Sequence, residues 1–446
     1  MDPVIVQRAE HCISRQDISP EALKVLYGLK EAGYIAYIAG GGVRDLLLGR
    51  KPKDFDIVTD ATPNEVRRVF RNCRLIGRRF RLAHVFYGAI NIEVATFRSN
   101  QEQEEEDGAA QGRDLHRRSD EGVILRDNVF GTPEQDAIRR DFTVNALFYD
   151  IRDFAVIDYV GGLEDLKRRI LRFIGDPQVR CVEDPVRMIR AVRFAAALGL
   201  TFDPATEQAI RDQRECLALA NRSRLYEEVQ KLFFCGAAQR AYELLRDFGL
   251  FSMLFPEVGV WLGPAKGTPE CRRISAALLQ VDEWRAAGRT VSPALLFALM
   301  FGGMHEAHAG ELVAQGQHKG LALHSVTMQH FGGLTERVQV PKTVRYRTAE
   351  ILASQPRLTA DGGRRARPLA TRAFFPEAAA YLEFTARLTG EHREALDVVL
   401  GIPWDPAPDA EFDPDRHRRG GRRGRRGKSF RAHRGGGRSE PHPADG

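Results

Sequence analysis

The sequence predicts an α/β domain with a small mixed sheet, followed by a long all-α region. Between residues 34 and 97, short apolar strands alternate with amphipathic helices, which is typical of a sheet with helices packed on it. From residue 184 to about residue 401, the pattern is helical almost throughout. The chain has 446 residues, which is too long for one ordinary core and favours two or three domains.

Apolar periodicity and helix-capping residues define the elements. In chain order we expect a helix at residues 21–30, a strand at 34–39, a helix at 43–48, a strand at 54–58, a helix from residue 62 and a strand at 90–97. Thr62 and Glu65 form a capping box, with Pro63 at the first helical position. Residues 101–120 are rich in Glu, Gly and Arg and predict a mobile loop, after which strand and helix patterns return.

The helical region begins at the dipeptide Asp184-Pro185. Asp184 can cap a helix whose first position is Pro185, and Gly199 can end that helix. Residues 403–414 read as a linker, and the remainder is a low-complexity tail rich in Arg and Gly.

Positive charge is concentrated in this tail. The chain carries a net charge of +6, yet eleven Lys or Arg and no acidic residue lie between Arg416 and Arg438, so the rest of the chain is net acidic. Such a run either keeps the protein soluble or binds a polyanion, and the Arg-Gly repeats favour RNA binding. The candidate RNA-binding residues of the tail are Arg422, Arg423, Arg425 and Arg426.

Composition argues against several classes of protein. No apolar run approaches the roughly 18 residues that a membrane span needs, and residues 1–15 lack the apolar centre of a signal peptide. The six cysteines have no CxxC spacing, which argues against a zinc site and against a disulfide framework. We therefore expect a cytoplasmic protein without a membrane span.

Two acidic residues point to metal-dependent chemistry. Asp54 and Asp56 flank Phe55 on an expected strand, so both carboxylates lie on one face. Such carboxylates repel each other unless a cation lies between them, and Mg²⁺ binds carboxylate and phosphate oxygens. The alternative is a solvated turn. Glu93 on the third strand is either a third carboxylate of this site or an exposed strand residue.

A glycine segment precedes the two acids. Gly41 and Gly42 lie between a strand and a helix, where glycine lets backbone N–H groups approach phosphates, and Arg44 could reach the same phosphates. The segment is not a Walker loop, because no Gly-Lys-Ser/Thr follows. The alternative is a flexible turn.

Arg139, Arg140, Asp141 and Asn145 lie where we expect a helix to start. On that helix Asp141 and Asn145 would share a face. The arginines beside an acid could bind a triphosphate and a ribose hydroxyl, or could form an N-cap with ordinary surface ion pairs.

Asp184 and Arg187 lie three residues apart at the start of the next helix. A carboxylate and a guanidinium in this relation can read the edge of a base by hydrogen bonds. Arg190 and Arg193 continue the charged stripe. The alternative is a capped helix with a solvated face.

Five segments, in order, resemble the motifs of class II nucleotidyltransferases, the family of bacterial poly(A) polymerases and CCA-adding enzymes. They are GGGVRDLLLG, KDFDIVTDATP, IEVATFR, RRDFTVNALFYD and EDPVRMIRAVRFAAALG. The resemblance covers about residues 13–257 and is weak from residue 261 to about residue 390. Residues 75–85 resemble the segment that distinguishes poly(A) polymerases, and the basic tail is also typical of that branch.

This resemblance implies a nucleotidyltransferase head with a sheet of about five strands, followed by an all-α neck and body. The implied domains are a leader at 1–20, a catalytic head at 21–175, a neck at 176–236, a body at 237–401 and a disordered tail at 402–446. It implies that Asp54 and Asp56 are metal ligands, that Asp141 lies near the ribose, and that Asp184 and Arg187 read the base.

The implied activity is template-independent polyadenylation in mRNA processing and decay. AMP passes from ATP to an RNA 3′ end with release of pyrophosphate, and the expected cofactors are two Mg²⁺ ions, with Mn²⁺ as a substitute. RNA-decay proteins are candidate partners of the tail. One alternative is a CCA-adding tRNA nucleotidyltransferase, which shares every catalytic residue. The other is a non-catalytic RNA-binding protein.

Overall fold

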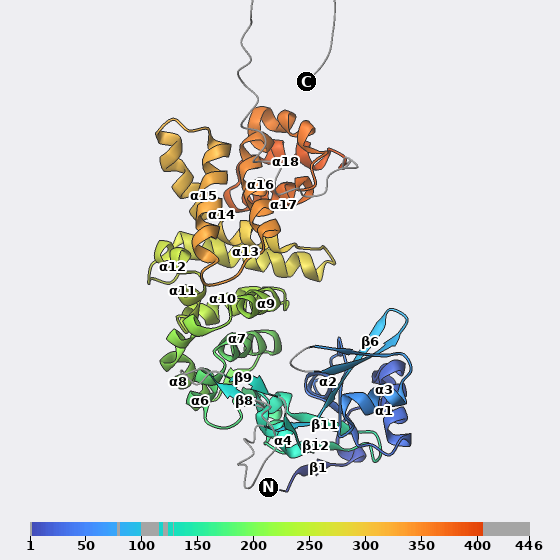
Figure 1. Ribbon diagram of the computed structural model, residues 1–446. Coiled ribbons are helices and arrows are strands. Elements are labelled where there is room, and N and C mark those ends of the chain that lie inside the picture. Colours follow the sequence, from blue (N-terminus) through green and yellow to red (C-terminus); the bar gives the residue numbers. More distant parts are fainter. Residues whose placement is uncertain (1, 78–80, 100–115, 119–123, 128, 405–446) are drawn as a thin grey trace, which may run out of the picture.

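The computed structural model describes residues 2–77, 81–99, 116–118, 124–127 and 129–404. These residues form an α/β head and a helical region that extends away from it (Figure 1). The head holds an eight-stranded sheet in the order β1-β12-β11-β2-β3-β6-β5-β4. Its strands are β1 (Val4–Val6), β2 (Ala36–Ala39), β3 (Asp56–Thr59), β4 (Cys73–Ile76), β5 (Leu82–Tyr87), β6 (Ile90–Thr96), β11 (Leu147–Asp150) and β12 (Val156–Asp158).

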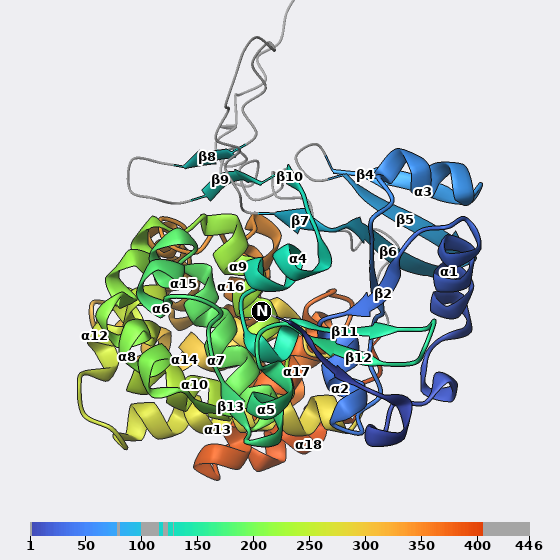
Figure 2. The ribbon, with the colours of Figure 1, turned by 90° about the horizontal axis from the view of Figure 1, so that it is seen from below.

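The sheet is mixed, as predicted. β3 and β6 pair in parallel, and all other neighbouring strands of the sheet pair antiparallel. One face packs against α1 (Pro20–Glu31), α2 (Gly41–Leu47) and α3 (Pro63–Val69), and Figure 2 shows α1 and α3 along this face. The other face is covered by a smaller core that includes Val58, Phe148 and Ala137 of α4 (Pro133–Arg139).

Eight strands replace the expected number of about five. Two of the strands, β1 and β12, have only three residues, which is too short for an alternating pattern to be visible in the sequence. β1 lies in the expected leader and pairs with β12 at the edge of the sheet. Shorter pairs are formed by β7 (Arg98–Ser99) with β10 (Val129–Phe130) and by β8 (His116–Arg118) with β9 (Ile124–Asp127).

The helix expected to open at residues 139–145 is not formed. α4 ends at Arg139, and Arg140 has an extended backbone with φ −64° and ψ 168°. The chain then bonds to residues 172–174: the N–H of Thr143 donates to the oxygen of Arg172 at 3.1 Å, and the N–H of Ile174 donates to that of Asp141 at 3.1 Å. These long-range bonds replace local helical ones, and the short η3 (Thr143–Asn145) leads into β11.

From residue 177 onward the described chain is mainly helical, as predicted. Its one strand within that range, β14 (Thr201–Phe202), pairs with β13 (Ile170–Leu171). The helices are α6 (Pro177–Glu183), α7 (Val186–Leu198), α8 (Pro204–Asp212), α9 (Arg222–Phe233), α10 (Ala238–Asp247), α11 (Leu250–Leu254), α12 (Pro256–Leu262), α13 (Pro269–Ala286), α14 (Pro293–Ala314), α15 (Lys319–Leu334), α16 (Lys342–Thr359), α17 (Phe375–Thr389) and α18 (Arg393–Leu400). The head also holds α5 (Gly162–Lys167), and 3-10 turns are η1 (Arg8–Glu10), η2 (Arg15–Asp17), η4 (Arg214–Leu219) and η5 (Ala360–Leu369).

The start of α7 differs from the prediction. Pro185 is its N-cap, and no side chain caps this helix. Asp184 instead ends α6, with φ −146° and ψ 89°, and its carboxylate is used elsewhere. Gly199 ends α7 in the left-handed region at φ 66°, as predicted.

The sequence from residue 302 to residue 314 is rich in Gly, His and Ala and forms the second half of α14. A side chain at Gly302 would collide with the hydroxyl of Tyr381. Nε2 of the fully buried His305 lies 2.9 Å from Nδ1 of His330, and burial lowers the pKa of both, that of His330 to about 4. Among the described residues, no helix is long and apolar enough to cross a membrane.

Candidate active site

Asp54, Asp56 and Glu93 belong to the end of β3 and its neighbour β6. Asp54 lies in the loop before β3 and not on the strand, because pairing with β2 stops at Asp56. Glu93 precedes Val94, which pairs with Ile57, so Glu93 and Asp56 occupy equivalent positions on one face. Burial raises the pKa of Asp56, and the charges of Glu93 and Asp54 raise it further. The positive charge of Arg140 acts in the opposite direction and lowers it. The three acids therefore interact electrostatically, and a cation would relieve their repulsion.

This group does not enclose a metal ion by itself. Within the described part of the chain, no three His, Cys, Asp or Glu side chains are close enough to hold one. Mg²⁺ often takes one or two protein carboxylates and completes its shell with water and substrate phosphates. Asp54 and Asp56 suit that mode of binding, and Glu93 stays a candidate third carboxylate.

The glycine turn between β2 and α2 packs on the same region. Gly40 has φ 68° and ψ −124°, a conformation that residues with a side chain avoid. A Cβ at Gly40 would lie 2.8 Å from Nη1 of Arg140, and a Cβ at Gly42 would lie 3.6 Å from the backbone oxygen of Asp54. The predicted nucleotide loop is thus placed directly beside the predicted metal ligands.

A series of polar contacts links α2 to α7. Arg44 is 6% exposed, and its Nη1 donates to Oδ1 of Asn145. Nδ2 of Asn145 donates to Oδ1 of Asp141 at 3.2 Å, and Arg190 donates to Oδ2 of Asp141 at 2.8 and 2.5 Å. Burial alone would raise the pKa of Asp141, but the charge of Arg190 and the hydrogen bonds from Arg190, Asn145 and the N–H of Phe142 together hold that pKa below its ordinary value. Asp141 is therefore an ionised, firmly oriented carboxylate.

Three guanidinium groups surround Phe194 on α7. Their carbons lie 5.1 Å (Arg44), 5.6 Å (Arg190) and 4.2 Å (Arg193) from the ring centroid. Glu228 of α9 is 5% exposed, accepts a hydrogen bond from Nε of Arg193 at 3.3 Å and lies 3.6 Å from Nη1 of Arg190. The arginine stripe therefore packs against α9, which contradicts the alternative of a solvated helix face.

Arg139 and Arg140 share one buried acid, Asp136. Nε and Nη2 of Arg140 donate to Oδ2 of Asp136 at 3.1 and 2.8 Å, and its Nη1 donates to the backbone oxygen of Asn145 at 3.2 Å. Nη1 of Arg139 lies 3.5 Å from Oδ1 of Asp136, which is 3% exposed. Arg140 is brought beside the glycine turn, and contact of either arginine with a triphosphate stays a prediction.

Asp184 and Arg187 bind different partners. Nη1 of Arg187 donates to Oε2 of Glu183 at 2.9 Å and to the backbone oxygen of Arg180 at 3.1 Å. Asp184 accepts two hydrogen bonds from Arg224 of α9, at 3.1 and 2.8 Å. The acid and the guanidinium are thus held separately, and their role as base readers stays a prediction.

Motif spacing in the sequence does not by itself identify three residues of the site, Arg180, Arg224 and Glu228. Nη2 of Arg180 donates to the backbone oxygen of Arg139 at 2.7 Å and also to that of Arg140, so it joins α6 to the end of α4. The sequence does hold a signal for Glu228, since it falls on the apolar face of α9. An acidic residue at such a position indicates a buried charge pair.

Some predicted features lie outside the described residues. These are Arg422, Arg423, Arg425 and Arg426, residues 78–80 of the segment at 75–85, and most of the expected loop at 101–120.

Three segments match known families. Residues 36–172 match the family described as Poly A polymerase head domain, residues 199–262 that described as Probable RNA and SrmB- binding site of polymerase A, and residues 315–428 that described as Polymerase A arginine-rich C-terminus. The chain is 44% identical over 389 residues to Poly(A) polymerase I of Salmonella typhimurium, which covers 86% of this chain and 82% of the relative. It is 46% identical over 301 residues to Poly(A) polymerase I of Haemophilus influenzae, which covers 67% and 65%.

CCA-adding enzymes match as well, over less of the sequence. The enzyme of Lactobacillus helveticus is 37% identical over 231 residues, which covers 52% of this chain and 54% of the relative. In structure, the chain is similar to the Bacillus stearothermophilus CCA-adding enzyme in complex with CTP, with a TM-score of 0.59 and 28% identity over 86% of this chain and 83% of that one. The fold of this chain is thus similar to that of the Bacillus stearothermophilus CCA-adding enzyme.

Proposed function

The chain belongs to the poly(A) polymerase family and is a nucleotidyltransferase, and from this premise we propose that it adds adenylates to RNA 3′ ends without a template. The 3′-hydroxyl oxygen of RNA bonds to the α-phosphorus of ATP, the bond to the β-phosphate breaks, pyrophosphate leaves, and the hydroxyl proton passes to water. One observation carries this proposal: identity to Poly(A) polymerase I extends over most of both chains, whereas identity to a CCA-adding enzyme covers about half of this chain.

The glycine turn and Arg44 would receive the triphosphate. Gly42 packs next to the backbone of Asp54 and Gly41 next to the guanidinium of Arg44, so phosphates bound on this turn would lie close to the acids. The guanidinium of Arg44 is buried and donates to Oδ1 of Asp45 and to Oδ1 of Asn145, so a phosphate would share it with Asp45. Arg140, bound to Asp136, adds positive charge next to Gly40.

Asp54 and Asp56 would hold Mg²⁺, or Mn²⁺ in its place, with Glu93 as a candidate third ligand. Two such ions, when bound, activate the 3′-hydroxyl and stabilise the departing pyrophosphate. Burial raises the pKa of Asp56 most, and the charges of Glu93 and Asp54 raise it further; this supports the assignment, because a bound cation would remove the repulsion between the acids.

Asp141 and Asn145 would position the ribose, while Asp184 and Arg187 read the base. Asp141 suits the first task because Arg190 keeps its carboxylate ionised and oriented. The base readers belong to the neck, at the junction of α6 and α7, and their partners hold each of them in place. Discrimination between adenine and cytosine therefore depends on neck contacts more than on the acids of β3.

CCA addition is the second candidate. It is favoured by the similarity in fold to a CCA-adding enzyme in complex with CTP and by catalytic residues that serve either activity. A non-catalytic RNA-binding role is less well supported, because Asp54, Asp56 and Asp141 are all in place.

RNA is the proposed macromolecular substrate. The matches to an RNA-binding family and to an arginine-rich C-terminal family support this choice, with the tail arginines as further contacts and RNA-decay proteins as partners. All six cysteines are free, which suits a reducing compartment, and we propose that the protein acts on mRNA in the cytoplasm.

The experiment supplies each nucleotide separately, with Mg²⁺, to unstructured RNA and to tRNA that lacks its CCA end. We expect many adenylates from ATP and little product from CTP. If tRNA instead gains only C, C and A, the CCA-adding activity is the correct one. Asp56→Asn should lower the rate by at least about 10³-fold, whereas Glu164→Gln, an exposed head acid, should not. A folded and active Asp56→Asn variant would contradict the metal assignment.

A further inference from the structure

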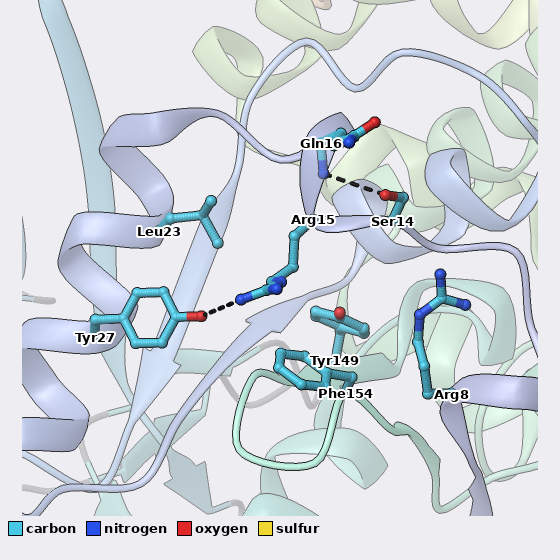
Figure 3. A pocket seen from close by; sticks show the side chains of 8 residues that line it. All are labelled: Arg8, Ser14, Arg15, Gln16, Leu23, Tyr27, Tyr149 and Phe154. Atoms are coloured by element: carbon cyan, nitrogen blue, oxygen red, sulfur yellow. Dashed lines mark hydrogen bonds between the residues drawn. The ribbon is translucent and has the colours of Figure 1, made fainter.

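The head also contains a cavity that none of the residues of the candidate active site line. Its volume is about 500 Å³, and its walls come from the leader, α1, β11 and the turn after β11 (Figure 3). A volume of this order is in the range of small-molecule sites, roughly 300–1,000 Å³.

Two arginines give this cavity a positive charge. The guanidinium carbon of Arg15 lies 4.9 Å from the ring centroid of Phe154, and its Nη1 donates to the hydroxyl of Tyr27 at 3.1 Å. Nη1 of Arg8 donates to the backbone oxygen of His11 at 3.1 Å. The residues that line the cavity include no acid, and among the described residues neither arginine pairs with a carboxylate. Both cations are therefore positioned by neutral groups and keep their charge available to an anion.

Tyr149 adds an unsatisfied donor to the wall. Its side chain is fully buried, and within the described structure its hydroxyl has no hydrogen-bond partner. Figure 3 shows this hydroxyl between the side chains of Arg8 and Arg15. Burial raises the pKa of Tyr149 while the charges of both arginines lower it, so both act on the hydroxyl. Buried hydroxyls without a partner are rare, and a ligand oxygen in the cavity would satisfy this one.

We propose that the cavity binds a phosphate group, with Arg8 and Arg15 as cationic partners and the hydroxyl of Tyr149 as a hydrogen-bond donor. Guanidinium groups suit phosphate oxygens because they offer several N–H donors in one plane. The ring of Phe154 provides an apolar surface for the organic part of the ligand. The phosphate belongs either to a free nucleotide or to an RNA backbone, since both offer the same anionic oxygens.

Binding measurements on the full chain test this site. The probes are AMP, followed by calorimetric titration, and a short oligoadenylate that ends in 3′-deoxyadenosine, followed by filter binding. Arg8→Gln with Arg15→Gln removes both charges, and Tyr149→Phe removes the hydroxyl but keeps the ring in the core. Lys30→Gln with Arg168→Gln is the matched control, because it removes two exposed charges elsewhere in the head. Thermal melting checks that each variant is folded.

We expect the double arginine variant to lose about tenfold or more in affinity for at least one probe, and Tyr149→Phe to lose several-fold for the same probe. Loss for AMP alone identifies a free nucleotide. Loss for the oligoadenylate alone, with a log–log salt slope lower by roughly 0.7 per contact, identifies an RNA phosphate. Unchanged affinity for both probes, or an equal loss in the Lys30 and Arg168 control, would overturn the proposal.

Discussion

Replacement of Gly40 by Ala measures how closely the glycine turn is packed. A residue with a Cβ at φ 68° and ψ −124° costs about 1–3 kcal/mol. The new Cβ would also lie 2.8 Å from Nη1 of Arg140, closer than real contacts, so Arg140 must move. Arg140 is bound to the buried Asp136, and weakening one charged hydrogen bond there adds about 1–3 kcal/mol. We expect the free energy of unfolding to fall by about 2–6 kcal/mol, which lowers Tm by roughly 4–24 °C.

Gly49→Ala is the matched control for this change. Gly49 also has a positive φ, 67°, but no atom lies within 4 Å of a Cβ built there. It should show the backbone cost alone and retain adenylate transfer, whereas Gly40→Ala should lose most transfer because Arg140 shifts. Thermal unfolding followed by circular dichroism and initial rates with ATP give the two readouts. Equal destabilisation and equal rates in both variants would refute the inference that the turn packs on Arg140.

Three further predictions concern charge. Metal binding needs an ionised Asp56, and the charge of Glu93 raises the pKa of Asp56. Glu93→Gln should therefore move the acidic limb of the pH–rate profile to lower pH. An acidic limb that does not move would show that the two acids are not coupled. Arg224→Ala releases Asp184 and should change the ratio of the rates with ATP and CTP several-fold. Tm should stay nearly constant, because the ion pair of Arg224 and Asp184 is partly exposed to solvent. An unchanged ratio of rates would argue against a role of Asp184 in reading the base. Truncation after Pro414 removes eleven basic residues and should weaken RNA binding and lower its salt slope, with little effect on the rate at saturating RNA; equal affinity would favour a solubilising tail.

Local patterns were sufficient for elements whose signals are local. The capping box of Thr62 and Glu65 starts α3 as predicted, and the alternation around Glu93 places Ile92 and Val94 in the core. Gly199 ends α7 as predicted. In each case the deciding interaction lies within a few residues of the element, so the sequence window contains it.

Long-range partners explain the remaining errors. The segment after Arg139 is extended because it bonds to residues 172–174, and no local pattern contains those bonds. Asp184 does not cap α7 because Arg224, 40 residues later, binds its carboxylate. Asp54 and Asp56 are close because they are two residues apart in the sequence, although Asp54 lies before the strand and not on it. The series of contacts from Arg44 to Arg190 spans more than a hundred residues and could be found only from the fold.

The contacts between α4, α6 and α7 have a mechanical consequence. Arg180 donates hydrogen bonds to two backbone oxygens at the end of α4, and Arg190 donates to the carboxylate of Asp141 in the segment that follows. Separation of α4 from α6 and α7 would leave the buried carboxylate of Asp141 without its cationic partner, at a cost of about 3–5 kcal/mol. Under the proposed activity, each added nucleotide requires the RNA end to advance by one residue. Because these contacts oppose such a separation, we expect the RNA end to move in each cycle while the contacts between α4, α6 and α7 stay closed.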